Sequence, residues 1–348
     1  MSGYHTLTPR LMAKSVERCF RVDRTPFISG PPGVGKSAIV KQIAARHQLA
    51  VIDHRLSTSD PTDLSGLPDR GGDKATFKPY DIFPIKGDPL PEGKKGWVLF
   101  MDEMNAADRS VQAAAYKLIL DRQVGQHDLH ENVVIAAAGN RLTDRAIVAD
   151  LSTAMQSRVI HLELEVSHRE WLEDVALKNN YDHRILAFLS DNKGMLHDFK
   201  PDHGEKTFCC PRTWEFMQDL IKDMSIPEMD EYVALLAGTI TSGVAVNFIQ
   251  YSKVFENLPR TADIIRDPDG VRVPNDNPTC YALTLTLTDY VDEKTIENIG
   301  KFMDHMGMEH RILFWRTMLA QRSDLREHEV FARSVISLNR YLNGPSTV

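Results

Sequence analysis

The sequence predicts an α/β domain followed by an all-helical region. Two observations predict the first part: a glycine-rich loop stands between a strand-like and a helix-like segment, and other short apolar runs end in polar residues. The second part follows from a change of period, because beyond His168 the apolar residues recur at helical intervals almost throughout. With 348 residues, 42% of them hydrophobic and 26% charged, the chain has the composition of an ordinary globular protein.

The glycine-rich loop reads GPPGVGKS and fits the pattern G-x-x-x-x-G-K-[ST] at every fixed position. Its glycines let the backbone wrap closely enough for several N–H groups to face phosphate oxygens. Lys36 adds a positive charge, and the hydroxyl of Ser37 is placed for Mg²⁺. The flanks agree, because Thr25–Ser29 reads as a short buried strand and the residues after the loop have a helical period. The loop therefore predicts a bound polyphosphate. The expected binding residues are Gly30, Pro31, Pro32, Gly33, Val34, Gly35, Lys36, Ser37 and Ala38.

A second feature is the apolar run from Trp97 that ends in Asp102 and Glu103. A buried strand of a parallel sheet delivers its C-terminal residues to the ligand crevice. There Asp102 can hold Mg²⁺ through its water shell, and Glu103 can polarise an attacking water. Two acids at a strand end can also be a merely solvated surface, but their occurrence together with the glycine-rich loop favours catalysis.

The remaining α/β elements follow in order. A helix is expected from Thr8 to Phe20, an insertion with exposed loops over Gly66–Leu90, and a polar, hairpin-like excursion over Arg122–Glu131. A strand ends directly before Asn140, whose amide can orient a water or a γ-phosphate; the alternative for this residue is an ordinary turn. Five strands are expected in all: Thr25–Ser29, Leu49–Ile52, Trp97–Glu103, Val133–Ala138 and the run from Ile160 to Leu164.

The C-terminal half is predicted to be helical. Pro211 stands at a natural first-turn position and fixes where the side chain of Arg212 starts. The segment from Arg260 to Pro278, rich in Asp, Pro and Asn, is expected to be a linker or long loop. Tyr281–Thr288 alternates like a strand, yet everything around it is helical, and we expect a helix there.

The net charge, the lengths of the apolar runs and the cysteine spacing limit the classes of function that fit this chain. The net charge of −7 argues against a broad nucleic-acid surface, although it is compatible with a local basic patch. The first ten residues lack a signal-peptide pattern, and the apolar runs are too short for a membrane span, so a cytoplasmic location is expected. Four cysteines without C-x-x-C spacing favour buried or idle thiols over zinc or redox chemistry.

The order of these features resembles that of AAA+ ATPases, and most closely the MoxR-like, dynein-related branch. The resemblance covers about the first two thirds of the chain. Its segments are Gly30 to Ser37 (Walker A), Leu99 to Asn105 (Walker B), Ala136 to Asn140, and Pro211 to Trp214.

The resemblance implies an AAA+ P-loop core with a five-stranded parallel sheet over residues 1–165, a helical lid over 166–260 and a helical C-terminal extension over 261–348. It also implies ATP hydrolysis with Mg²⁺ in a ring, usually a hexamer, with nucleotide between neighbouring subunits. On this interpretation Lys36 and Ser37 bind phosphates and Mg²⁺, Asp102 is the second metal-side ligand, and Glu103 activates water. Asn140 matches the sensor-1 position, Arg212 the sensor-2 position, and Arg158 the arginine finger.

The chain departs from the family pattern after the finger arginine, where Val159 replaces the common Phe. Arg141 and Arg145 compete for the same role, and a salt bridge at the strand start is the structural alternative for Arg158. The segments Gly66–Leu90 and Arg122–Glu131 resemble the helix-2 insert and the pre-sensor hairpin, which in this branch face the ring pore or a partner. Family members often pair with a von Willebrand factor A-domain protein.

Three functions fit these features. The first is an ATP-hydrolysing, chaperone-like ring that remodels or activates a protein partner. The second is an ATP-dependent DNA motor or loader, which would need basic pore residues such as Lys74 and Lys78. The third is an ATP-gated assembly protein with little turnover, against which the intact Glu103 and Asn140 argue. A GTPase is disfavoured because Asn192-Lys193 is not followed by x-Asp, and a small-molecule kinase fits the paired acids less well than hydrolysis does.

Overall fold

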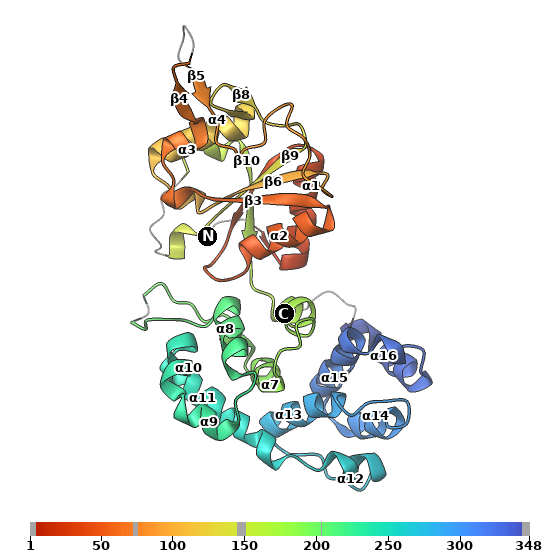
Figure 1. Ribbon diagram of the computed structural model, residues 1–348. Helices are drawn as coiled ribbons and strands as arrows, with labels where there is room; N and C mark the ends of the chain where they lie inside the picture. The colour runs from red at the N-terminus through yellow and green to blue at the C-terminus, as the bar shows by residue number, and fades with distance from the viewer. Residues whose placement is uncertain (1–4, 72–75, 145–150, 203, 343–348) are drawn as a thin grey trace. The chain divides into compact units, whose positions relative to one another are not determined.

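In the computed structural model, the chain divides into two compact units. The N-terminal unit comprises Met1–Val166 with Lys200–Asp202, and the helical unit comprises Ser167–Phe199 with His203–Val348 (Figure 1). The structure describes residues 5–71, 76–144, 151–202 and 204–342. The predicted fold class is confirmed, since an α/β core with a parallel sheet precedes a helical region. A further division of the helical region at residue 260 stays a prediction.

The core of the N-terminal unit is a parallel sheet, which has six strands among the described residues. The sequence predicts five of them. The sixth, β1, has only two residues and pairs with the end of β10, so it is too short for a period to show. In spatial order the strands are β1 (Thr6–Leu7), β10 (Val159–Leu164), β2 (Thr25–Ser29), β9 (Val133–Gly139), β6 (Gly96–Asp102) and β3 (Leu49–Arg55).

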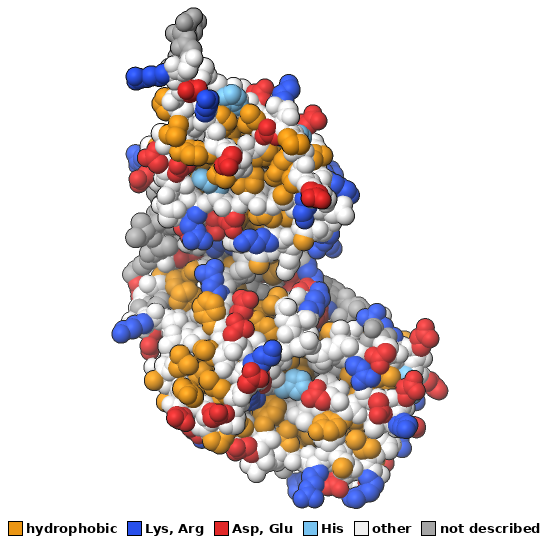
Figure 2. All heavy atoms as spheres, viewed as in Figure 1, with side chains coloured by type: hydrophobic (Ala, Val, Ile, Leu, Met, Phe, Trp, Pro, Cys, Tyr) orange, Lys and Arg blue, Asp and Glu red, His pale blue; other side chains and the backbone are white. Residues whose placement is uncertain are grey.

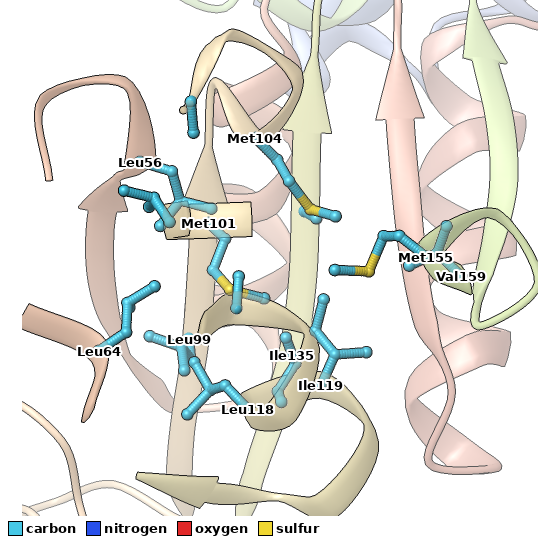
Figure 3. Packing of buried hydrophobic residues seen from close by; sticks show 14 of the residues in the cluster. Leu56, Leu64, Leu99, Met101, Met104, Leu118, Ile119, Ile135, Met155 and Val159 are labelled. Atoms are coloured by element: carbon cyan, nitrogen blue, oxygen red, sulfur yellow. The ribbon is translucent and has the colours of Figure 1, made fainter. Parts of the chain in front are cut away.

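Helices cover both faces of this sheet (Figure 1). Side chains alternate along each strand, so Val98 and Phe100 of β6 face one helical layer while Leu99 and Met101 face the other. The first layer consists of α1 (Pro9–Arg21) and α2 (Lys36–Arg46), and the second contains α3 (Pro61–Ser65), α4 (Arg109–Asp121) and α5 (Thr153–Gln156). Figure 3 shows the second layer, where Leu118 and Ile119 of α4 lie near strand residues. Because both faces are buried, the strands read as continuous apolar runs.

The strand register sets the position of the site. Ser29 pairs with Gly139, and Met101 pairs with Ala137, so β2, β9 and β6 end at the same edge of the sheet. Asp102 is the last residue of β6, and Asn140 directly follows β9. The polar residues that the sequence places after three separate strands therefore share the carboxyl edge of the sheet.

The described residues of this unit include two small hairpins. One lies in Gly66–Leu90, where the sequence predicts an insertion with exposed loops, and the other in Arg122–Glu131, where it predicts a hairpin-like excursion. They are connected to each other, because Nε2 of His127 lies 2.9 Å from the backbone oxygen of Phe77. Gly125, in the turn of the second hairpin, has φ of 61° and packs closely against α3 and the first hairpin: a Cβ there would lie 2.3 Å from the oxygen of Ser65 and 3.2 Å from Cβ of Phe77. The hairpin strands are β4 (Leu67–Asp69) with β5 (Thr76–Lys78), and β7 (Gln123–Val124) with β8 (His127–Asp128).

The helical unit has α13 at its centre, and this helix confirms the expectation for Tyr281–Thr288. The predicted linker over Arg260–Pro278 contains a short helix, α12. No helix in the described ranges is long and apolar enough to cross a membrane. The helices are α6 (His168–Trp171), α7 (His183–Asp191), α8 (Pro211–Ile221), α9 (Ile226–Glu231), α10 (Val233–Ile240), α11 (Ser242–Ser252), α12 (Thr261–Arg266), α13 (Asn277–Thr288), α14 (Ile296–His305), α15 (Met308–Gln321) and α16 (Glu329–Leu342).

A histidine at the start of the helical unit makes its stability sensitive to acid. Burial, with Lys193 and then Arg316 contributing, lowers the pKa of His168 to about 4. The folded state therefore binds fewer protons than the unfolded state between pH 6.5 and 4, and stability falls as pH falls through this window, by up to about 1.4 kcal/mol per pH unit. Melting temperatures at pH 7 and pH 5 should differ less for His168→Gln than for the wild type. His47→Gln, at an exposed position, is the control; an unchanged pH dependence in His168→Gln contradicts the prediction.

Candidate active site

The glycine-rich loop joins β2 to α2 at the carboxyl edge of the sheet. Gly33 and Gly35 have φ of 74° and 90°, a region that favours glycine. A Cβ at Gly30 would lie 3.1 Å from the oxygen of Leu164, so the loop also passes close to β10. Among the described residues no side chain caps the start of α2, which begins at Lys36. The first N–H groups of this helix thus form the kind of site that binds an anion.

Lys36 connects this loop to the residue that follows the neighbouring strand β9. Its Nζ donates hydrogen bonds to the backbone oxygens of Gly30 and Pro31 and to Oδ1 of Asn140, each over 2.9 Å. The ammonium group is thereby held at the loop, with the side-chain amide of Asn140 beside it. The sequence placed these two residues 104 positions apart, and the fold brings them into direct contact.

Ser37 and Asp102 form the second contact between motifs. Oγ of Ser37 donates to Oδ2 of Asp102 over 3.1 Å, and Asp102 is only 9% exposed. Two adjacent ligands of an octahedral Mg²⁺, each at 2.0–2.1 Å, are about 2.9 Å apart. The spacing of these two oxygens is therefore compatible with Ser37 and Asp102 holding one Mg²⁺ together, which would supply positive charge beside the phosphates.

Glu103 follows in a left-handed conformation, with φ of 55° and ψ of 34°. Such a conformation is costly for a residue other than glycine and is found preferentially at functional sites. Its carboxylate accepts a hydrogen bond from Oγ of Ser57 and lies 3.6 Å from Nε of Arg55. The side chain remains 38% exposed, so it is accessible to water.

Sequence reasoning missed Ser57 and Arg55. Arg55 ends β3 and pairs in register with Asp102, so a correct register between β3 and β6 would have placed it beside Glu103. Ser57 lies in the short 3₁₀ turn that follows β3. Its side chain reaches Glu103 only because β3 and β6 are neighbours, which the local sequence does not show.

Arg158 lies at the opposite edge of the sheet from the loop. It precedes β10, where Val159 pairs with Thr25 at the start of β2, whereas the loop follows the end of β2. The five residues of β2 span roughly 16 Å at the usual strand rise. Arg158 donates to the backbone oxygen of Ala154 over 2.6 Å, and its Cζ lies 4.7 Å from the ring centroid of Tyr116. The fold therefore does not bring Arg158 to the loop of its own subunit.

The other arginines differ in position. Arg141 lies at the carboxyl edge and is paired with Asp144 over 2.9 Å and with Glu163 over 3.6 Å. Arg145 lies outside the described residues. Arg212 is exposed at the second position of α8, in the helical unit.

The class of the N-terminal unit follows from this arrangement: it is a P-loop domain with its loop, acidic strand end and asparagine at one edge of a parallel sheet. Residues 26–172 match the AAA domain of the dynein-related subfamily. This part of the chain is therefore an AAA domain of that subfamily. ATPases with such domains generally bind ATP and Mg²⁺ and typically form oligomeric rings.

Likenesses to solved structures are weak. One mutant of the RuvB protein of Thermotoga maritima is 17% identical, with 83% of this chain and 85% of that chain covered and a TM-score of 0.37. The T. maritima RuvB Holliday junction branch migration motor is 16% identical, with 84% and 85% covered and a TM-score of 0.34. A Cytophaga hutchinsonii protein named as a candidate ATPase is 12% identical, with 95% and 88% covered and a TM-score of 0.37. Likenesses of this strength carry no argument about function.

Proposed function

We propose that the chain is an ATP-hydrolysing, MoxR-like AAA+ protein that works in the cytoplasm as a ring, a hexamer by family resemblance, and remodels or activates a protein partner. The observation that carries the ATPase proposal is the pair of contacts at the carboxyl edge. Lys36 lies 2.9 Å from Asn140, and Ser37 lies 3.1 Å from Asp102. A phosphate-binding group, a magnesium-binding pair and a polar sensor are thereby brought together in one unit.

Each residue has a proposed role. The loop amides and Lys36 bind the phosphates, and Ser37 and Asp102 hold Mg²⁺, which when bound supplies positive charge to the phosphate oxygens. Glu103 orients the attacking water and accepts its proton. Asn140, already in contact with Lys36, has an amide that can bond the water or the γ-phosphate.

Arg158 is proposed to complete the site of a neighbouring subunit. Its place at the amino edge of the sheet supports this, because the same residue cannot reach its own loop. Arg141 fits the role less well, since two carboxylates of its own subunit hold it at the other edge. Arg212 of the helical unit is proposed to act as the second sensor.

A protein partner is favoured by the surface. The hairpin of β4 and β5 exposes Leu67 (49%) and Phe77 (38%), apolar side chains of the kind that contact protein. On the face shown in Figure 2, Lys and Arg side chains are interspersed with Asp and Glu, which does not resemble a nucleic-acid track. A von Willebrand factor A-domain protein is proposed as a partner on family resemblance alone.

Mixing two inactive variants tests the shared site. Glu103→Gln retains the arginine that serves the neighbour, and Arg158→Ala retains the loop and Glu103. Each variant alone should hydrolyse ATP slowly. After subunit exchange at equal amounts, about a quarter of the interfaces should combine intact Glu103 with intact Arg158, and a matching share of wild-type phosphate release should return.

The control is Arg141→Ala, which should regain no activity on mixing with Glu103→Gln if Arg141 belongs to its own subunit's site. Co-purification of differently tagged subunits verifies exchange. Absence of recovery in mixed assemblies would contradict Arg158 as the shared arginine, and absence of wild-type phosphate release at any protein concentration would contradict the ATPase proposal itself.

A further inference from the structure

A buried amide lies between the turn of Glu103 and the end of β9. Asn105 is 5% exposed and belongs to a 3₁₀ turn, Met104–Ala106, that directly follows Glu103. Met104 holds this turn in place, because its side chain is fully buried in the hydrophobic cluster that includes residues of α4 and α5. Figure 3 shows Met104 extending into this cluster above Met101. The backbone that carries Glu103 is therefore anchored in the core.

Asn105 joins this turn to the neighbouring strand. Its Nδ2 donates a hydrogen bond of 2.7 Å to the backbone oxygen of Asn140. The side chain of Asn140 in turn accepts the hydrogen bond from Lys36 over 2.9 Å. One buried amide thus fixes the backbone of a residue whose side chain contacts the phosphate-binding lysine.

Gly139 permits this contact. A Cβ at Gly139 would lie 2.2 Å from Oδ1 and 2.7 Å from Cγ of Asn105, so the amide lies directly against the backbone of Gly139. Oδ1 is buried and has no hydrogen-bond partner among the residues that the structure describes. A buried, half-satisfied amide is less favourable for stability than an apolar group of the same shape. Stability alone therefore does not account for asparagine at this position.

We propose that Asn105 is a positioning residue, which fixes Asn140 relative to Glu103 at the ends of the paired strands β6 and β9. This inference rests on the proposed ATPase function. Asn105 itself touches neither phosphate nor water in this role; it acts through Asn140. Displacement of a catalytic group by about 1 Å can reduce a rate by about 100-fold.

Asn105→Leu tests the proposal, because leucine has a similar size and cannot donate to Asn140. The expected result is a decrease of kcat by about tenfold or more, with KM for ATP changed by less than about threefold. The matched control is Gln112→Leu. Gln112 is also a buried amide, 6% exposed, and donates over 3.0 Å to the oxygen of Ala107 on the same segment, away from Asn140. Gln112→Leu should leave kcat unchanged whatever it does to the melting temperature.

A double-mutant cycle separates positioning from general damage. Gly139→Ala should lower kcat, because the new Cβ displaces the Asn105 amide. Asn105→Ala removes the two nearest atoms that this Cβ would meet and leaves Cζ of Phe27, at 2.9 Å, in both backgrounds. The double variant should therefore be at least about threefold more active than the product of the single effects predicts. Strictly multiplicative effects on kcat, or an Asn105→Leu enzyme with wild-type kcat and KM, would overturn the proposal.

The two proposals fail in different ways. A wild-type chain without ATP turnover would remove the proposed function and with it the role of Asn105. A wild-type chain with turnover that Asn140→Ala reduces and Asn105→Leu does not would leave the proposed function standing and overturn the positioning role alone.

Discussion

Glu103→Gln is expected to bind ATP as the wild type does and to hydrolyse it at least about 100-fold more slowly, since a general base contributes about 10²- to 10⁴-fold. Glutamine keeps the size of the side chain and an oxygen that can accept from Ser57, but it cannot accept a proton from water. The loop, Lys36, Ser37 and Asp102 are untouched, so the phosphate and magnesium contacts remain. Phosphate release and binding of a fluorescent ATP analogue measure the two effects separately.

The control for this variant is Glu131→Gln, which removes one exposed carboxylate away from the loop and should leave turnover unchanged. Undiminished hydrolysis by Glu103→Gln would show that another group activates the water. If the variant lost ATP binding as well as turnover, Glu103 would contribute to binding. We do not expect this, because the Glu103 side chain is 38% exposed and follows Asp102, the residue proposed to hold Mg²⁺.

Lys36→Ala is expected to weaken ATP binding by at least about 100-fold, since each hydrogen bond to a charged group contributes about 1.5–3 kcal/mol and the ammonium can make two to phosphates. The measurement is titration with a fluorescent ATP analogue in the presence of Mg²⁺. The variant also removes the donor that Gly30, Pro31 and Asn140 share, so circular dichroism has to establish that the variant is folded.

Lys41→Ala provides the matched control. Lys41 lies on the same helix, is 54% exposed and pairs with Asp53 over 2.9 Å, so its removal takes away the same charge without touching the loop. It should bind ATP within about twofold of the wild type, because exposed ion pairs contribute about 1 kcal/mol or less to local structure. A folded Lys36→Ala variant with normal affinity would contradict the role of the loop in binding phosphate.

The parts of the site that the sequence predicts are those encoded by consecutive residues. The loop, the Asp102–Glu103 strand end and Asn140 each follow a buried run, and parallel strands of one sheet deliver their ends to one edge. Asn105 and Ser57 escape this reasoning, since their partners lie on a neighbouring strand. Only the strand order and register bring these pairs together. The catalytic roles of all these residues stay predictions.

The ambiguity over Tyr281–Thr288 has a physical cause. Seven of these eight residues are buried, so α13 has no polar face and no amphipathic period. Its buried threonines are satisfied within the helix: Oγ1 of Thr284 donates to the oxygen of Cys280, and Oγ1 of Thr288 donates to that of Leu285. Threonine at every second position from Thr284 gives the alternation that is typical of a strand. The segment is nevertheless helical, because it packs among other helices.

Arg158 lies at the amino ends of the strands and the glycine-rich loop at their carboxyl ends, so each subunit has two different surfaces for its neighbours. On the proposed function, one edge offers an arginine and the other receives one, so subunits join head to tail and a two-fold dimer, which pairs like with like, cannot form a complete site. A row of subunits that stays open has one complete site fewer than it has subunits, whereas closure adds the missing one. Activity per subunit therefore reports whether the assembly has closed.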